Sequence, residues 1–319
     1  MSYKIYTPSG IATAPPEGKA VVALGIFDGV HAAHRTLLRS ALSLGKSLGA
    51  ELVGAWCFGD SPASLLGGEE IPQLCTLEDK VNTLLSLGLD FVAVGDFKSL
   101  RSLSACDFIH RVLMKELHCI GAACGFNHRF GYMGQGTPEM LAEAFGRDAV
   151  AVLPEVKLFS ETVSSSAIRA LIADGQVGRA QLMLGRPFSL KAPVLTGKRL
   201  GRSLGFPTAN QYFPAGTVTP AHGIYATVCT TEDGKRYVGV SNVGIRPTIT
   251  DGSDRHEPNC ETYIHGFSGN LYGRALKVEF YEFLRPEMKF RSTEELKAQI
   301  EKDLASALTY FEGLDSPAL

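Results

Sequence analysis

The chain has 319 residues, 45% of them hydrophobic and 20% charged, with a formal net charge of −2 at pH 7. This length favours two domains, and the near-neutral charge lacks the basic surplus typical of proteins that bind nucleic acid or anionic membranes. No apolar stretch has the length of a membrane span or of a secretory signal. The seven cysteines form no C-x-x-C pair, which favours reduced thiols over disulfides or a zinc site.

The first half of the chain alternates between apolar runs and helical patterns. Helix start signals occur at Thr76, with Asp79 as its capping-box partner, at Ser104 and at Thr137-Pro138. Strands that alternate with helices predict a parallel α/β sheet covered on both faces. The apolar runs that predict its strands are 21–27, 50–58, 91–97, 119–126 and 149–156.

After about residue 157 the pattern changes. Residues 164–188 predict two short helices separated by Gly175, and from residue 190 short strands and turns follow, including a hairpin with an Asp233-Gly234 turn. This pattern indicates an antiparallel barrel or sandwich. We expect two domains, 1–184 and 185–319. The last predicted helix has an apolar stripe of Leu296, Ile300, Leu304, Ala307, Leu308 and Phe311.

The segment LGIFDGVHAAHRTLL (24–38) places two histidines where the first predicted strand leads into a helix. With a helix starting near Val30, His31 and His34 lie on one face, about one turn apart. Ligands of parallel α/β sheets bind at this edge, and a helix N-terminus attracts phosphate. The residues alone leave three interpretations open: ordinary surface polar groups, phosphate contacts, or metal ligands that lack an evident third partner.

A second candidate site is the segment GRSLGFPTAN (201–210). A glycine-rich turn lets backbone N–H groups approach phosphates, and Thr208 and Asn210 offer the hard oxygen ligands that Mg²⁺ takes together with substrate phosphates. The alternative is an ordinary tight turn between strands, where Gly, Pro and Asn are also common. Downstream, residues 248–261 predict a polar loop, of the kind that either closes over a substrate or is disordered.

Several segments resemble, in the same order, motifs of the prokaryotic bifunctional riboflavin kinase/FAD synthetase family, and the resemblance covers nearly the whole chain. It implies a Rossmann-like nucleotidyltransferase domain with a parallel sheet, followed by an antiparallel β-barrel riboflavin kinase domain with a terminal helix. The segments that carry the resemblance are GIFDGVHAAH (25–34), GFNHRFG (125–131), VSSSAIR (163–169), GFPTAN (205–210), NVGIRPT (242–248), CETYI (260–264) and RPEMKF (285–290).

This resemblance implies FAD biosynthesis in two steps. The second domain would phosphorylate riboflavin to FMN with ATP, and the first would adenylylate FMN to FAD and release pyrophosphate. Mg²⁺ and ATP are the implied cofactor and co-substrate, and FMN and FAD the product ligands. The expected partners are riboflavin, FMN and ATP, without nucleic acid or membrane, for a cytoplasmic monomer or weak homo-oligomer.

The resemblance also implies roles for individual residues. His31 and His34 would act on the triphosphate, and Glu261 would be the catalytic base of the kinase. Thr208 and Asn210 would hold the metal ion. Flavin binding is implied for Phe206, Arg246 and Arg285, although either arginine could instead form a structural ion pair. ATP binding is implied for Gly25, Phe27, Asp28, Asn127, Ser165, Ser166, Arg169, Gly201, Gly205, Pro207, Thr208 and Asn210.

The sequence departs from the family pattern at several positions. Ala33 replaces the glycine between the histidines, Ile26 stands where asparagine is frequent, and FGDSP (58–62) replaces a run similar to F-D-P-H-P. His128 occupies an aromatic position, and Ser166 replaces threonine conservatively. These departures motivate an alternative, a monofunctional riboflavin kinase whose first domain only binds nucleotide or supports folding. A third hypothesis, a non-catalytic flavin-binding protein, has no need of a catalytic base.

Overall fold

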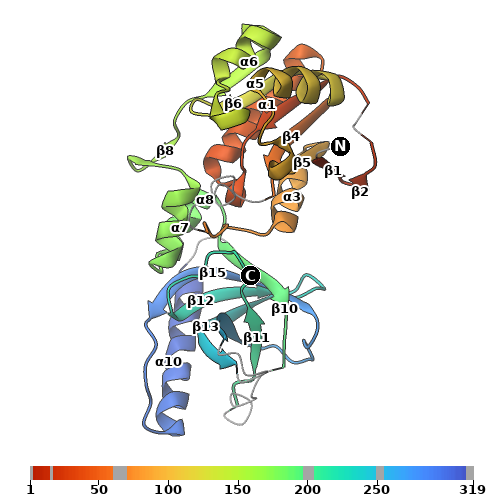
Figure 1. The fold of residues 1–319 in the computed structure, drawn as a ribbon. Coiled ribbons are helices and arrows are strands. Elements are labelled where there is room, and N and C mark those ends of the chain that lie inside the picture. The colour runs from red at the N-terminus through yellow and green to blue at the C-terminus, as the bar shows by residue number, and fades with distance from the viewer. Residues whose placement is uncertain (1–2, 15–16, 60–69, 197–204, 249–254, 314–319) are drawn as a thin grey trace. The chain divides into compact units, whose positions relative to one another are not determined.

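The computed structural model describes residues 3–14, 17–59, 70–196, 205–248 and 255–313 (Figure 1). The chain forms two compact units, residues 1–165 and residues 166–319. Helices α7 (Ser165–Ala173) and α8 (Val177–Leu184) therefore belong almost entirely to the second unit. The expected domain boundary at 184/185 places these two helices in the first domain instead. That boundary, as a division between functional domains, stays a prediction.

The first unit contains a seven-stranded sheet with the order β2-β1-β5-β4-β3-β6-β7. Its central strands pair in parallel, as the five apolar runs predicted. Two antiparallel strands at one edge were not predicted. The strands are β1 (Tyr3–Thr7), β2 (Gly10–Ala12), β3 (Ala20–Leu24), β4 (Leu52–Phe58), β5 (Phe91–Gly95), β6 (Cys119–Gly125) and β7 (Val150–Leu153).

Helices cover both faces of this sheet (Figure 1). Helices α1 (Ala32–Leu48) and α3 (Leu77–Ser86) pack on the face that carries Val21 and Ala23. The opposite face, with Val22 and Leu24, is covered by α5 (Ala105–Asp107), its continuation as the π-helix η2 (Phe108–Glu116), and α6 (Pro138–Phe145). Burial on both faces explains why the strands are continuous apolar runs rather than alternating ones.

The predicted helix starts of the first unit are correct. Thr76 accepts a hydrogen bond from the Asp79 N–H at 3.1 Å, and Ser104 accepts one from the Asp107 N–H at 3.0 Å. The remaining elements of this unit are short: η1 (Asp28–Val30), α4 (Phe97–Leu100), η3 (Tyr132–Gly134), η4 (Arg147–Ala149), β8 (Lys157–Leu158) and β9 (Glu161–Thr162).

The second unit contains a six-stranded antiparallel sheet with the order β10-β15-β12-β13-β14-β11. The predicted Asp233-Gly234 turn connects β12 to β13, with Gly234 at a φ of 81°. Within the predicted polar loop at 248–261, residues 249–254 lie outside the described residues, and the prediction is wrong from Arg255 onward, where the residues pair as a strand. The strands are β10 (Phe188–Pro193), β11 (Thr208–Tyr212), β12 (Gly223–Thr230), β13 (Arg236–Thr248), β14 (Arg255–Ile264) and β15 (Ala275–Arg285).

The two edges of this sheet, β10 and β11, are tied together, which curls it into a barrel. The Leu195 N–H donates to the Asn210 carbonyl at 2.8 Å. The fully buried Gln211 amide donates to the carbonyls of Ala192 and Leu276 at 2.7 and 2.8 Å. These bonds replace part of the missing backbone ladder between the edge strands, whose N–H and C=O groups would otherwise be unpaired. The predicted antiparallel barrel is therefore confirmed.

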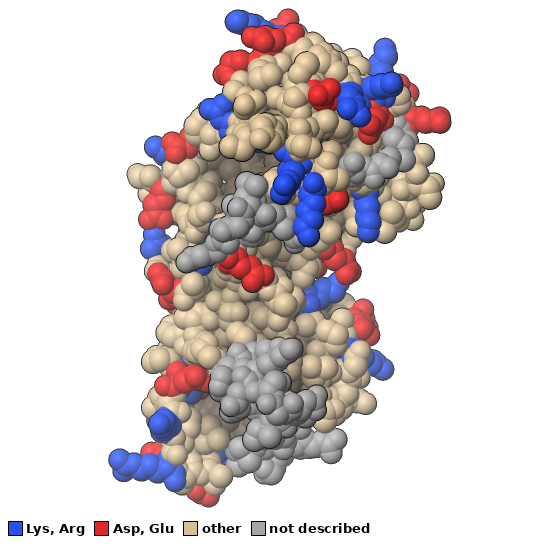
Figure 2. Space-filling view, in the orientation of Figure 1, with Lys and Arg blue, Asp and Glu red and all other residues tan. Residues whose placement is uncertain are grey.

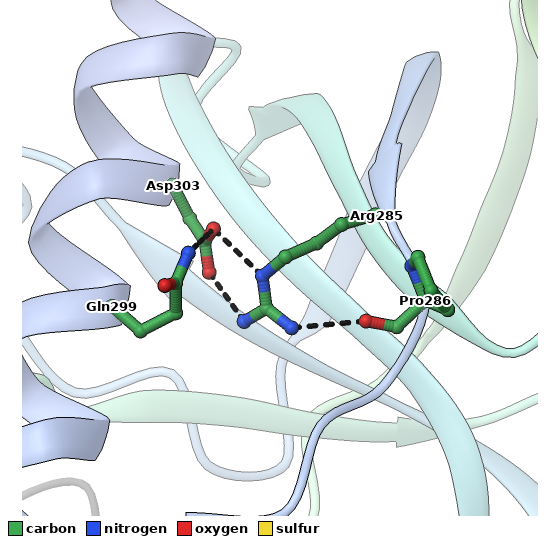
Figure 3. Close-up of polar contacts among 4 residues, drawn as sticks. All are labelled: Arg285, Pro286, Gln299 and Asp303. Atoms are coloured by element: carbon green, nitrogen blue, oxygen red, sulfur yellow. Dashed lines mark hydrogen bonds and ion pairs between the residues drawn. The ribbon is translucent and has the colours of Figure 1, made fainter.

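Helix α10 (Thr293–Glu312) packs on the outside of β12 and β13. Ala307 and Phe311 from its predicted apolar stripe contact a cluster that includes Val228, Val240 and Tyr281. A bidentate ion pair ties the helix to the end of β15 (Figure 3). The Arg285 guanidinium donates to the two Asp303 carboxylate oxygens at 2.9 and 2.7 Å.

The described part of the chain contains no helix long and apolar enough to cross a membrane. On the face shown in Figure 2, Lys and Arg side chains are interspersed with Asp and Glu rather than gathered into one basic surface. This distribution agrees with the net charge of −2.

Breaking the Arg285–Asp303 pair is expected to destabilise the second unit. The Asp303→Ala variant leaves the Arg285 guanidinium, whose side chain is 16% exposed, without its carboxylate partner. We expect a loss of about 3 kcal/mol in the free energy of unfolding, measured by chemical denaturation. The exposed Lys235–Asp233 pair is the control, because Lys235→Ala should cost much less stability than Asp303→Ala. Equal losses in the two variants would contradict the assigned role of Asp303.

Candidate active sites

The loops that follow the parallel strands of the first unit lie at one edge of the sheet. The strand order reverses at β3, which lies between β4 and β6. In open α/β sheets, ligands bind at the carboxyl ends of the strands that flank such a switch point. β3 leads into Gly25 and β6 leads into Asn127, so both predicted nucleotide segments start at this edge.

The turn between β3 and α1 has an unusual backbone. Phe27 and Val30 have φ angles of 54° and 43°, in the left-handed region that residues with a Cβ rarely adopt. Val30 is β-branched and fully buried, so the surrounding packing must outweigh this strain. A Cβ at Gly25 would lie 3.1 Å from the Phe27 ring, so glycine there lets the ring lie against the turn.

Asp28 anchors this turn from within. Its carboxylate is buried, and Oδ1 accepts a hydrogen bond from the Leu74 N–H at 2.7 Å. Its backbone carbonyl accepts one from the Ser165 hydroxyl at 3.2 Å. Asp28 therefore holds the turn against the segment before α3 and the first residue of α7. A direct contact of Asp28 or Phe27 with ATP stays a prediction.

The structure brings His31 and His34 together as the sequence predicted. Their rings stack with centroids 3.6 Å apart and an interplanar angle of 14°. His31 is the N-cap of α1, and its Nδ1 accepts from the His34 N–H at 3.4 Å. Because Nδ1 accepts, the proton of a neutral His31 ring lies on Nε2, which makes Nε2 a hydrogen-bond donor.

The His34 ring is enclosed by aromatic neighbours. It lies between His31 and Phe27, whose ring centroid is 5.1 Å away. Burial, followed by the proximity of His31 and Lys80, holds the pKa of His34 well below its usual value of 6.5. Its Nδ1 is buried and has no hydrogen-bond partner among the residues that the structure describes. His34 is thus a neutral imidazole with unused hydrogen-bonding capacity.

Ala33, the main departure from the family pattern, lies in the first turn of α1. Its φ angle is not positive, so the helical backbone at this position accepts alanine as readily as glycine. Alanine also has the higher helix propensity, by about 1 kcal/mol. Nothing in the local backbone therefore requires a glycine between the two histidines.

Asn127 lies exposed in the turn after β6, where the His128 N–H donates to the Gly125 carbonyl at 3.0 Å. His128 fills the aromatic position of its motif as an aromatic ring would, because it stacks on Phe130 with centroids 5.8 Å apart. Burial lowers the pKa of His128 to about 4, so its ring is neutral at physiological pH. Binding of ATP by Asn127 stays a prediction.

Two further predicted phosphate ligands, Ser166 and Arg169, lie on α7. The Arg169 guanidinium donates to the Ser166 hydroxyl at 3.0 Å. This contact places a cation and a hydroxyl side by side, which suits a phosphate oxygen. Their role in binding the triphosphate stays a prediction.

In the second unit, three polar side chains form a row across adjacent strands. Asn210 on β11 is directly opposite Glu261 on β14, which is directly opposite Asn242 on β13. Side chains at such paired positions project from the same face of a sheet, with Cβ atoms about 5 Å apart. Thr208 lies two residues before Asn210 and projects from this same face. Thr208 and Asn210 thus lie on a strand, so the interpretation as a simple turn is wrong for them.

Glu261 has a hydrogen-bonding neighbour on its own strand. The buried Asn259 donates from Nδ2 to Glu261 Oε1 at 3.3 Å. On the other side of the row, Asn242 Oδ1 is buried without a hydrogen-bond partner within the described ranges. An amide that donates to one carboxylate oxygen fixes the direction of the carboxylate.

The residues next to this row are partly described. Gly205 has a φ of 85°, Phe206 packs edge-on against Tyr263 with centroids 5.1 Å apart, and Pro207 is exposed. Gly201 and the other residues from 197 to 204 lie outside the described residues, as does FGDSP after Gly59. The backbone of Arg246 belongs to β13, and its side chain is outside the described part.

The guanidinium of Arg285, a predicted flavin ligand, forms hydrogen bonds within the second unit. Besides its two bonds to Asp303, its Nη1 donates to the Pro286 carbonyl at 3.0 Å (Figure 3). Asp303 also accepts from Gln299 at 2.9 Å. The ion-pair interpretation of Arg285 therefore matches the observed contacts, and flavin binding by Arg285 stays a prediction.

Three residues with a place in these sites were not found from the sequence: Lys80, Asn242 and Asn259. Asn242 and Asn259 lie within or beside quoted motifs. The period-two spacing of Asn259 and Glu261 on one strand was the available signal, whereas Asn242 meets Glu261 only through strand pairing. Lys80 is a charged residue in an amphipathic helix, where a solvent-exposed position is the normal expectation. Its burial could not have been read from the helix alone.

Known protein families match both units. A family model described as FAD synthetase matches residues 14–167, and one described as riboflavin kinase matches residues 184–311. A solved structure named as a macrolide-efflux protein from Streptococcus pneumoniae superposes with a TM-score of 0.84 at 27% identity. That likeness covers 93% of this chain and 96% of the other.

Curated relatives extend over nearly the same length. A bifunctional riboflavin kinase/FMN adenylyltransferase of Bacillus subtilis is 33% identical over 302 residues, covering 93% of this chain and 94% of the relative. The protein of the same name from Escherichia coli K12 is 33% identical over 313 residues, covering 97% of each chain.

The fold and the two sites define a two-unit phosphate-transfer protein, with a doubly wound nucleotide-binding unit followed by an antiparallel barrel. Together with the two family models and the full-length relatives, this architecture is decisive. The chain belongs to the family of bifunctional riboflavin kinase/FMN adenylyltransferases. Both domains of that family are present, which favours the two-activity hypothesis over the monofunctional alternative.

The neutral histidines predict that the first unit loses stability in mild acid. In the unfolded chain His34 and His128 take up protons below about pH 6.5, whereas their folded pKa values are lower. The unfolded state then binds more protons, so stability falls by about 1.4 kcal/mol per pH unit for each such histidine. The free energy of unfolding is measured with urea at several pH values from 7.5 to 5. The fluorescence of Trp56, the single tryptophan, reports unfolding of the first unit.

The His34→Gln variant is the control for this pH dependence. It removes one of the two titrating groups, so its stability should fall less steeply with decreasing pH than that of the wild type. A wild-type stability that is constant between pH 7.5 and 5, or an unchanged slope in the variant, would show that His34 is protonated in the folded state.

Proposed function

We propose that the chain makes FAD from riboflavin with two molecules of ATP, one used in each unit. One observation carries the proposal: in each unit, residues that the family motifs predict to act on phosphate or on a hydroxyl proton lie together in the structure. The first unit has the stacked His31–His34 pair at the switch point of its sheet. The second has Glu261 directly opposite Asn210.

In the second unit, Glu261 is the base that accepts the proton of the ribityl 5′-hydroxyl. As this oxygen forms its bond to the γ-phosphorus of ATP, the bond from the γ-phosphorus to the β,γ-bridging oxygen breaks and ADP leaves. Asn259 supports this role by donating to Oε1, which fixes the direction of the carboxylate on its strand. Asn242 Oδ1 is an acceptor for a further substrate hydroxyl.

Thr208 and Asn210 fit a magnesium ion chemically. Both offer hard oxygen donors from one face of β11, and Glu261 lies opposite. The Asn210 Nδ2 donates to the Thr208 carbonyl at 3.4 Å, which orients the amide. Mg²⁺ prefers such oxygens together with substrate phosphates. When bound, it neutralises charge on the phosphates of ATP.

In the first unit, a phosphate oxygen of FMN attacks the α-phosphorus of ATP. The bond between the α-phosphorus and the α,β-bridging oxygen breaks, and pyrophosphate leaves, so no proton transfer to a side chain is needed. The protein has to position the two phosphates and stabilise the developing charge. His31 does this as a donor through Nε2–H, and the N-terminus of α1 adds its unpaired N–H groups.

Two variants separate the proposed activities in one chromatographic assay of riboflavin, FMN and FAD. His31→Asn keeps a side chain able to cap α1 but removes the imidazole, so FMN should accumulate with FAD formation slowed about 100-fold or more. Glu261→Gln should block phosphorylation of riboflavin but still convert added FMN to FAD.

The outcomes test the two units independently, because the unchanged activity of each variant reports folding of the other unit. FAD formation by His31→Asn at the wild-type rate would contradict the role of the histidine. Conversion of riboflavin to FMN by Glu261→Gln at the wild-type rate would contradict the assignment of the base.

A further inference from the structure

Lys80 on α3 is a buried charge with an unusual set of contacts. The residue is only 1% exposed. Its Nζ donates to the carbonyls of Phe58 at 3.1 Å and Gly59 at 3.4 Å. No carboxylate of the described residues pairs with it. A buried ammonium group that has carbonyl dipoles as its partners within the described residues costs stability relative to an apolar side chain of the same length.

The position of this charge is next to the proposed adenylyl-transfer site. Phe58 is the last residue of β4, the strand beside β3. The Gly25 N–H donates to the Trp56 carbonyl at 3.2 Å, so the end of β4 is attached to the start of the turn that carries the histidines. The charge of Lys80 is also one of the causes that lower the pKa of His34. The electrostatic effect of Lys80 therefore reaches the histidine pair.

We infer that Lys80 is a positioning residue for adenylyl transfer, which fixes the end of β4 beside the turn and provides a fixed positive charge behind His34. This inference rests on the proposed function of the first unit. The ATP triphosphate and the departing pyrophosphate carry the negative charge of the reaction. A fixed cation in a buried, low-dielectric position favours that charge without having to reorganise, even though it touches neither molecule.

The Lys80→Met variant tests this inference, because it keeps the apolar stem and removes the charge. For FAD synthesis we expect kcat/KM for ATP to fall about tenfold, and in the reverse direction KM for pyrophosphate to rise similarly. KM for FMN should stay within about twofold, and riboflavin phosphorylation by the same molecules should be unchanged. The midpoint of urea unfolding by Trp56 fluorescence should be unchanged or higher.

Two further variants separate charge from structure. Val81→Ala removes apolar volume from the neighbouring position of α3, which is 4% exposed, so it should lower the unfolding midpoint and leave the KM values unchanged. Lys80→Gln can still donate to a carbonyl but has no charge, so it should resemble Lys80→Met in kcat/KM for ATP and in KM for pyrophosphate. Lys80→Gln also decides the test if Lys80→Met does not fold.

Each outcome is decisive. Wild-type constants for ATP and pyrophosphate in a folded Lys80→Met or Lys80→Gln variant would overturn the inference, as would equal changes for ATP and FMN or failure of both variants to fold. The wild-type protein distinguishes the two levels. If it forms no FAD from FMN and ATP, the proposed function of the first unit fails. If it forms FAD and Lys80→Met behaves in the same way, only the role of Lys80 fails.

Discussion

The chain passes from the buried strand β3 into α1 through one short turn, Gly25–His31, and the rest of the first site depends on this turn. Phe27 and Val30 are held in left-handed conformations there, which is possible only because their side chains are fully buried and Asp28 bonds to segments on either side. The turn ends with His31 as the cap of α1, so the same residue that starts the helix also carries the imidazole. The packing that holds the strained turn therefore also sets the position of the histidine pair.

In the second unit, regular strand pairing rather than a strained turn positions the residues of the candidate site. Antiparallel pairing sets Asn210, Glu261 and Asn242 in one row, and Asn259 reinforces it from two residues away. The row depends on the register, because a slip by one residue would turn Glu261 into the barrel interior. The barrel is held in that register by the bonds of Gln211 across its open edge and by α10, which the Arg285–Asp303 pair attaches to β15.

Much of this architecture could be predicted from the sequence, and the failures have physical reasons. The central strands and the helices capped by Thr76 and Ser104 were predictable, because burial on both faces and local capping leave signatures within a few residues. The pairing of His31 with His34 followed from helical spacing. Contacts between distant segments leave no such signature. The burial of Lys80 depends on the carbonyls of Phe58 and Gly59, and the ion pair of Arg285 depends on Asp303, eighteen residues further on in α10. Residues 255–261 were mistaken for part of a loop because polar residues such as Asn259 and Glu261 lie on a strand.

Labelled ATP tests the central claim most directly, namely that the two units break different bonds of ATP. Wild-type protein is incubated with riboflavin and either [γ-³²P]ATP or [α-³²P]ATP, and the flavins are separated and counted. Label from the γ-phosphate should appear first in FMN and then in FAD. Label from the α-phosphate should appear only in FAD, at one adenylyl group per molecule. Label from the γ-phosphate in FMN but none from the α-phosphate in FAD would show that the first unit does not transfer the adenylyl group.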